Sequence, residues 1–144
     1  MKEIMSKFGT ELCERSRQLA VKIIRLSSGM PRNPAGWEIA KQIVRSSNSV
    51  PANLEEAQGA ISSPDFIHKV NLARKEARET LMWLRNIKDS GLLVGSQLDE
   101  LMTEANEVVC LLVASVKTLQ SKQKTASKEK SGSNSRFAIR DSRL

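Results

Sequence analysis

The fold of this chain is decided by residues 98–119, which read LDELMTEANEVVCLLVASVKTL. The middle of the stretch is rich in β-branched residues and, on composition alone, would suit a strand. Its apolar residues return at steps of three, four and seven along the whole stretch, which is longer than most strands. This period places them on one face of an amphipathic helix. The residues of that face are Leu98, Leu101, Ala105, Val108, Leu112 and Leu119.

Three segments before this stretch repeat the same apolar period. The first runs from between Ser6 and Thr10 to about Ser28, the second covers about 35–60, and the third runs from Ser63 to a stop at Ser90 and Gly91. Four helices joined by short connections normally alternate in direction. A chain of 144 residues suits one domain. We therefore predict an all-α fold, an up-down-up-down antiparallel four-helix bundle formed by residues 1–120.

The second segment contains a proline at its centre, in the run SVPANLEEA at residues 49–57. Pro51 lacks a backbone donor, and its ring crowds the carbonyl group of Ser47. We expect a proline-kinked second helix with the bend near 46–49; alternatively, Ser49 caps a helix that restarts there. The serines before the bend would let a neighbouring helix come close, and their hydroxyl groups would bond to carbonyls that Pro51 leaves free. We interpret the run as a structural joint rather than a ligand site.

The net charge of +7 is concentrated at the carboxyl end of the chain. Residues 121–144 hold seven basic and two acidic side chains, a charge of +5, whereas the first 120 residues hold sixteen and fourteen, a charge of +2. The tail is rich in serine and lysine and has few apolar residues to bury, so we predict that it is disordered. It is either a solubilising tail or an electrostatic contact to nucleic acid.

Several classes of function find no support in the sequence. Cys13 and Cys110 lie far apart and His68 is the single histidine, so no metal site or disulfide framework is indicated. The acidic residues are scattered and no glycine-rich phosphate loop is present. We therefore predict no catalytic residue, no metal, no cofactor and no enzymatic activity. No apolar run is long enough to cross a bilayer or to resemble a secretion signal, which predicts a cytoplasmic protein without a membrane partner.

Three runs of the sequence together resemble a known bacterial family. They are QIVRSSNSVPANLEEA at 42–57, SPDFIHKVNLARKEARETLMWLRNIKDSGLL at 63–93 and ANEVVCLL at 105–112. In this order they are similar to the four-helix-bundle family that includes proteins encoded in intervening sequences of the 23S ribosomal RNA gene. The similarity spans about residues 8–120. It implies a bundle that assembles into a homopentameric ring, and most members of the family have no assigned biochemical role.

A more distant resemblance is to the accessory protein of diversity-generating retroelements, a basic pentameric barrel that partners a reverse transcriptase and nucleic acid. Basic residues of the third segment are the candidates for a contact of this kind. Arg74, Lys75, Arg78 and Arg85 fall within a sector of about 100° on that helix. Arg45 matches a basic residue of the family's RSS-x-SV-x-AN element. A ring would repeat these residues and multiply their phosphate contacts with RNA or DNA.

Two other interpretations of these residues remain open. The basic sector is alternatively a solvated helix face that pairs with Glu79 and its neighbours. The protein is alternatively an interaction scaffold that binds another protein and not nucleic acid. In that case Leu72, Trp83 and Ile87 would make subunit or partner contacts, because aromatic anchors are enriched in interfaces. Trp83 would otherwise be an ordinary core residue.

Overall fold

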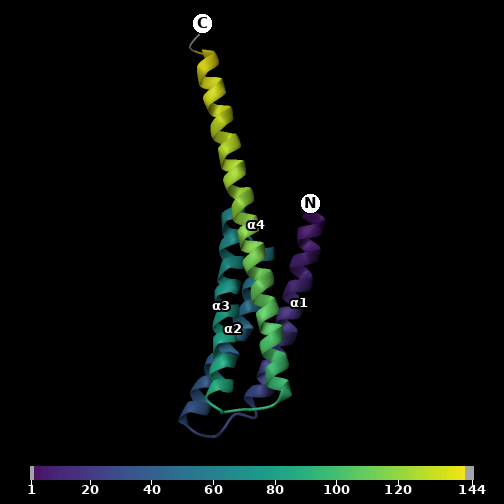
Figure 1. Cartoon of the computed structure of the whole chain (residues 1–144). Helices are drawn as coiled ribbons and strands as arrows, with labels where there is room; N and C mark the ends of the chain where they lie inside the picture. The colour runs from purple at the N-terminus through teal and green to yellow at the C-terminus, as the bar shows by residue number, and fades with distance from the viewer. Residues whose placement is uncertain (1, 142–144) are drawn as a thin grey trace.

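The computed structural model describes the backbone of residues 2–141 and the side chains of residue 7 and residues 9–133. Residues 2–141 form four helices that alternate in direction, with α4 continuing past the other three (Figure 1). The predicted all-α four-helix bundle is therefore confirmed. The side chain of Phe8 in the first segment lies outside the described residues, as do those of three basic residues of the tail, Arg136, Arg140 and Arg143. The helices are α1 (Lys2–Ser27), α2 (Pro34–Gln58), α3 (Ser63–Asp89) and α4 (Ser96–Asp141).

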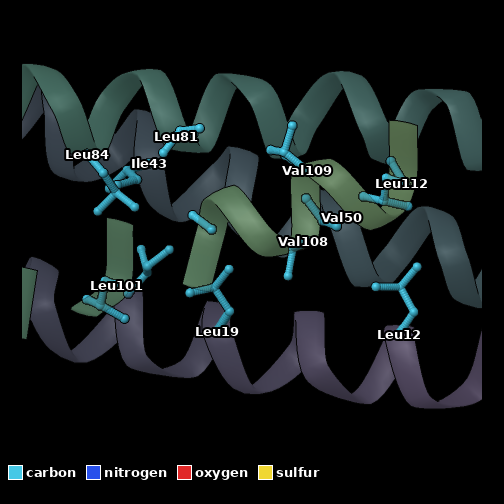
Figure 2. Close-up of a cluster of buried hydrophobic side chains, with 14 of the residues drawn as sticks. Leu12, Leu19, Ile43, Val50, Leu81, Leu84, Leu101, Val108, Val109 and Leu112 are labelled. Atoms are coloured by element: carbon cyan, nitrogen blue, oxygen red, sulfur yellow. The ribbon is translucent and has the colours of Figure 1, made fainter. Parts of the chain in front are cut away.

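Each helix packs against two neighbours in the order α1, α2, α3, α4, and α4 returns to α1. The apolar faces predicted from the sequence meet along the axis of the bundle, where leucine, isoleucine and valine side chains from all four helices converge (Figure 2). Ile23, Leu84 and Leu112 are completely buried there. Removal of apolar surface from water, at about 25 cal/mol per Å², is the main stabilising contribution of such a core. The apolar faces of the four helices therefore form a single hydrophobic core.

Pro51 lies inside a continuous helix. Helix α2 runs without interruption from Pro34 to Gln58, so the restart at Ser49 is wrong. The side chains around the proline do bond to the backbone: Asn48 donates to the carbonyl of Val44 at 2.7 Å and Asn53 to that of Ser49 at 2.8 Å. No described side chain bonds to the Ser47 carbonyl that Pro51 deprives of its usual donor. The polar side chains therefore support the turns on either side of that carbonyl.

The small residues before Pro51 do allow a close approach between helices. Ser46 and Thr80 are 0% and 1% exposed, and the Thr80 hydroxyl donates to Ser46 Oγ at 3.0 Å across the α2–α3 contact. Ala73 and Ala77 of α3 are likewise buried. A buried hydroxyl is tolerated only when it is hydrogen-bonded, and the Ser46 hydroxyl in turn donates to the carbonyl of Ile43 at 3.3 Å. Val50, Pro51, Leu54 and Ala57 of the SVPANLEEA run are buried as well, in line with the predicted structural joint.

The structure differs from the sequence-based prediction over the tail, because residues 121–141 continue α4 instead of leaving helical structure. Contact with the core ends at Leu119, close to the predicted boundary at residue 120. From 120 to 133 every side chain is exposed except that of Gln123, which is half-buried. No proline interrupts this segment, and its lysine, glutamine, alanine and glutamate residues are good helix formers. Residues 120–133 therefore project from the bundle as a helix whose side chains are mostly exposed (Figure 1).

Candidate nucleic-acid interface

A surface groove of about 670 Å³ lies between α3 and α4. Its floor is apolar, with Leu81 from α3 and Val109 and Val113 from α4. Its edges are polar and basic. The remaining lining residues are Arg78, Arg85, Asn106, Cys110, Ala114 and Lys117. We refer to this feature as the α3–α4 groove.

Three cations on the edges of the α3–α4 groove have no acidic partner among the described residues. Arg78 and Arg85 are exposed and stand seven positions apart, so they share one face of α3. Lys117 is exposed on α4. No ion pair or hydrogen bond is made by any of the three side chains within the part of the chain that the structure describes. The groove therefore carries uncompensated positive charge beside an apolar floor.

Two acidic residues of α4 beside the groove face α1, whereas a third, Asp99, pairs with Lys88 at the far end of α3 at 2.7 Å. Glu104 accepts an ion pair from Lys22 of α1 at 2.9 Å, and Glu107 pairs with Arg15 of the same helix. Since side chains on the α1 side of α4 point away from α3, these carboxylates do not neutralise the groove. Because Glu104 and Glu107 face α1 and Asp99 is held by Lys88, none of these three acids pairs with the cations of the groove.

Arg45 lies at a different contact, between α2 and α3. It pairs with Glu79 and, at 3.5 Å, with Glu76. Its hydrogen bond to Glu79 raises the pKa of the Arg45 guanidinium. Partial burial by itself would raise the pKa of Glu79, but hydrogen bonds from Arg45 and Trp83 outweigh that effect and leave this pKa below the ordinary carboxyl value. The charge of Arg45 is therefore largely compensated.

The other two predicted cations are also separate from the groove lining. Arg74 is half-buried and its Nε donates to Asn71 Oδ1 at 2.7 Å. Lys75 is exposed, about 100° around α3 from Arg74. Of the five predicted residues, only Arg78 and Arg85 line the groove. Sequence reasoning missed Lys117, although its seven-residue spacing from Cys110 was a usable signal.

The hydrophobic residues expected to form a contact surface are distributed differently from the prediction. Ile87 is 0% exposed and belongs to the core, so its assignment to an outer flank is wrong. Trp83 is half-buried against the core, and its indole nitrogen donates to Glu79 at 3.3 Å. Leu72 is half-buried. The exposed tryptophan is Trp37, in the first turns of α2, with 63% of its surface accessible.

The interior offers little room for a substrate. A cavity of about 10 Å³ lies between Ser16, Ser47 and Thr80, which is at most the space for one water molecule. Every buried polar side-chain atom of the described residues has a hydrogen-bond partner. Burial, followed by the charge of Glu55, raises the pKa of the Cys13 thiol, which disfavours the reactive thiolate. The side chains of the core therefore stabilise the fold and do not form a substrate-binding site.

No group of three or more histidine, cysteine, aspartate or glutamate side chains is placed to hold a metal ion in the part of the chain that the structure describes. No helix within it has the length and hydropathy required to cross a bilayer.

Comparison with known proteins finds a matching family model and solved structures with the same fold. The family model of the 23S rRNA-intervening sequence proteins matches residues 10–114. A solved structure from Bacteroides thetaiotaomicron VPI-5482, described as a protein of unknown function from the S23 ribosomal protein family, is 32% identical and has a TM-score of 0.69. The match covers 76% of this chain and 97% of that one. No curated protein matches the chain.

Proposed function

Since the chain belongs to the 23S rRNA-intervening sequence protein family, we propose that it is a non-enzymatic protein that binds structured RNA as a homo-oligomer, with the pentamer as the expected state. The α3–α4 groove is the proposed RNA contact. The observation that carries the proposal is the set of unpaired cations formed by Arg78, Arg85 and Lys117 on its edges. We also propose that the protein is cytoplasmic.

The chemistry of the groove suits a phosphate backbone. Guanidinium groups bind phosphate through two parallel hydrogen bonds, and both arginines have these donors free within the described structure. A surface cation that already pairs with a carboxylate must lose that partner before it binds phosphate, which is the situation of Arg45. The groove cations have no such cost. Several copies in one assembly would multiply the phosphate contacts and raise the avidity.

The proposal is tested by measuring RNA affinity at several salt concentrations. The double variant Arg78→Gln/Arg85→Gln is expected to weaken binding to a structured RNA about tenfold or more and to lower the salt slope by about two. The matched control is Arg25→Gln/Arg32→Gln, because these exposed arginines lie outside the groove. Equal losses in the two variants, or no binding by the wild-type chain, would overturn the proposal.

Cys110 provides a direct probe of what occupies the groove. It is exposed and lines the groove, whereas Cys13 is buried. A maleimide should therefore modify Cys110 first, and RNA should protect it from the reagent. Protection that appears on raising the protein concentration without RNA would instead identify the groove as a contact between copies or with another protein.

The assembly is tested separately by light scattering of the purified chain. The expected mass is five times that of the chain. A mass of 16.0 kDa, that of one chain, would contradict the oligomer and remove the avidity argument. RNA binding by the groove would still be measurable in that case, so the two parts of the proposal fail independently.

A further inference from the structure

Residues 120–133 of α4, beyond the bundle, form a polar helix without an apolar stripe. Between 120 and 133, the one aliphatic side chain of the described segment is that of Ala126. A helix that docks into a hydrophobic groove needs apolar anchors at steps of three and four, and this segment has none. Its charged residues are Lys122, Lys124, Lys128 and Lys130 against Glu129. The composition therefore favours an anionic ligand over a protein groove.

The lysines of this projecting segment divide into two faces. Lys117, Lys124 and Lys128 follow one another at steps of seven and four, so they lie within about 40° of each other around α4. The same spacing connects Lys117 to the groove residues Cys110 and Asn106. Lys122 and Lys130 fall on other sides of the helix. The cationic edge of the α3–α4 groove therefore continues along one face of the projecting helix.

We propose that the α3–α4 groove and this face of α4 form one continuous strip that binds the phosphate backbone of double-stranded RNA. The inference rests on the proposed RNA-binding function and specifies its ligand. From Asn106 to Lys128 the strip is about 33 Å long, at about 1.5 Å of rise per residue. A continuous helix of this length matches a rigid duplex better than a flexible single strand.

The side chains along the strip also favour a duplex. Proteins that bind single-stranded RNA stack its bases on aromatic side chains, and no aromatic residue belongs to the described strip. Double-stranded RNA is instead recognised by its shape and through contacts with its backbone. A row of arginine and lysine side chains provides contacts of that second kind.

The projecting helix should gain stability when the strip is occupied. Lys124 and Lys128 are four positions apart, a spacing at which like charges destabilise an exposed helix. The described side chains of the segment are exposed except that of Gln123, and isolated helices are marginal in water. Phosphate groups beside these lysines would remove the repulsion. Duplex RNA is therefore expected to increase the helical circular dichroism signal of the full chain.

The decisive experiment compares two double variants of the full chain. Lys124→Gln/Lys128→Gln removes two charges from the proposed face, and Lys122→Gln/Lys130→Gln removes two from the other sides of the same segment. Lysine and glutamine have similar helix propensities, so both variants should fold alike. The first is expected to weaken binding of a duplex RNA of arbitrary sequence about tenfold and to reduce the salt slope by about two. The second should change affinity less than about twofold.

Three outcomes would overturn this inference. Equal losses of affinity in the two variants would show that RNA is attracted to the charge of the whole segment and not to one face of the helix. Binding of a single strand of the same length as tightly as the duplex would exclude the proposed ligand. If neither variant changes affinity while Arg78→Gln/Arg85→Gln still does, the strip is wrong and the groove remains the RNA contact.

Discussion

Along residues 69–85 the two sides of α3 use charge in opposite ways, whereas at the end of the helix Lys88 pairs with Asp99 of α4 at 2.7 Å. On the side of α2, Arg45 is held by Glu76 and Glu79, and Lys69 of α3 pairs with Glu56 of α2 at 2.9 Å. On the side of α4, Arg78 and Arg85 have no carboxylate partner within the described residues. The difference shows that a basic residue on this bundle is a ligand candidate only where the neighbouring helix offers no acid.

The largest expected effect concerns the close approach that α2 makes to α3. Ser46→Leu places a bulky side chain where Ser46 is completely buried against Thr80. Overpacking of this kind should lower the free energy of unfolding by about 1–3 kcal/mol, measured by chemical denaturation. The same exchange at the exposed Ser121 is the control and should have little effect. Equal stability of the Ser46 variant and the wild type would refute the tight packing.

A smaller effect is expected from placing a carboxylate on the α4 edge of the α3–α4 groove. Asn106 is exposed and lines the groove with Arg85, so Asn106→Glu would supply the missing partner. RNA affinity should fall about threefold to tenfold, because the carboxylate repels phosphate and competes for the arginine. Asn106→Gln is the uncharged control and should retain affinity. A glutamate variant that binds as well as the glutamine variant would contradict the groove as the contact.

A change at the α2–α3 contact should alter the stability of the protein and leave its RNA affinity unchanged. Arg45→Gln removes the partner of Glu79, and because Arg45 is 49% exposed the loss should be modest, about 0.2–1 kcal/mol by denaturant titration. RNA affinity should remain within about twofold of the wild type. A large loss of affinity with unchanged stability would reverse the assignment of the two sides.

The smallest effect is the pH dependence of the same ion pair. The pKa of Glu79 is lower in the folded protein than its ordinary value of 4.5, so its contribution to stability is present above that pH. The contribution is lost as the pH falls through the folded-state pKa. Glu79→Gln should therefore reduce the acid sensitivity of unfolding, seen when denaturation at neutral pH is compared with denaturation below pH 4.5. Identical acid profiles would show that Glu79 does not contribute to this dependence.

The helices were predictable because each carries a wide apolar stripe with the helical period. Ile23, Leu84 and Leu112 follow that period and are buried, as the pattern required. The misassignment of Ile87 has a simple cause: its angle on α3 lies beside the stripe, and only the position of the neighbouring helices makes that edge interior. The helical continuation after residue 120 was missed because low hydropathy argues against burial without excluding an exposed helix.

The candidate site was less predictable than the fold. Periodicity correctly grouped Arg78 with Arg85 on one face of α3, but it gave no basis for separating them from Arg45. Lys117 is far from both in the sequence and joins them because α4 runs antiparallel to α3. Trp83 and Trp37 are the same type of residue, and the difference in their exposure follows from tertiary packing.

The sequence by itself determined four amphipathic helices and the concentration of positive charge after residue 120, because periodicity and composition act locally along the chain. The tertiary structure decided which charges are compensated. Coulomb interactions between surface groups act over a few ångströms, so the partner of a cation depends on which helix lies beside it and in what register. That is why Arg45 became part of a structural contact while Arg78, Arg85 and Lys117 were left available to a ligand.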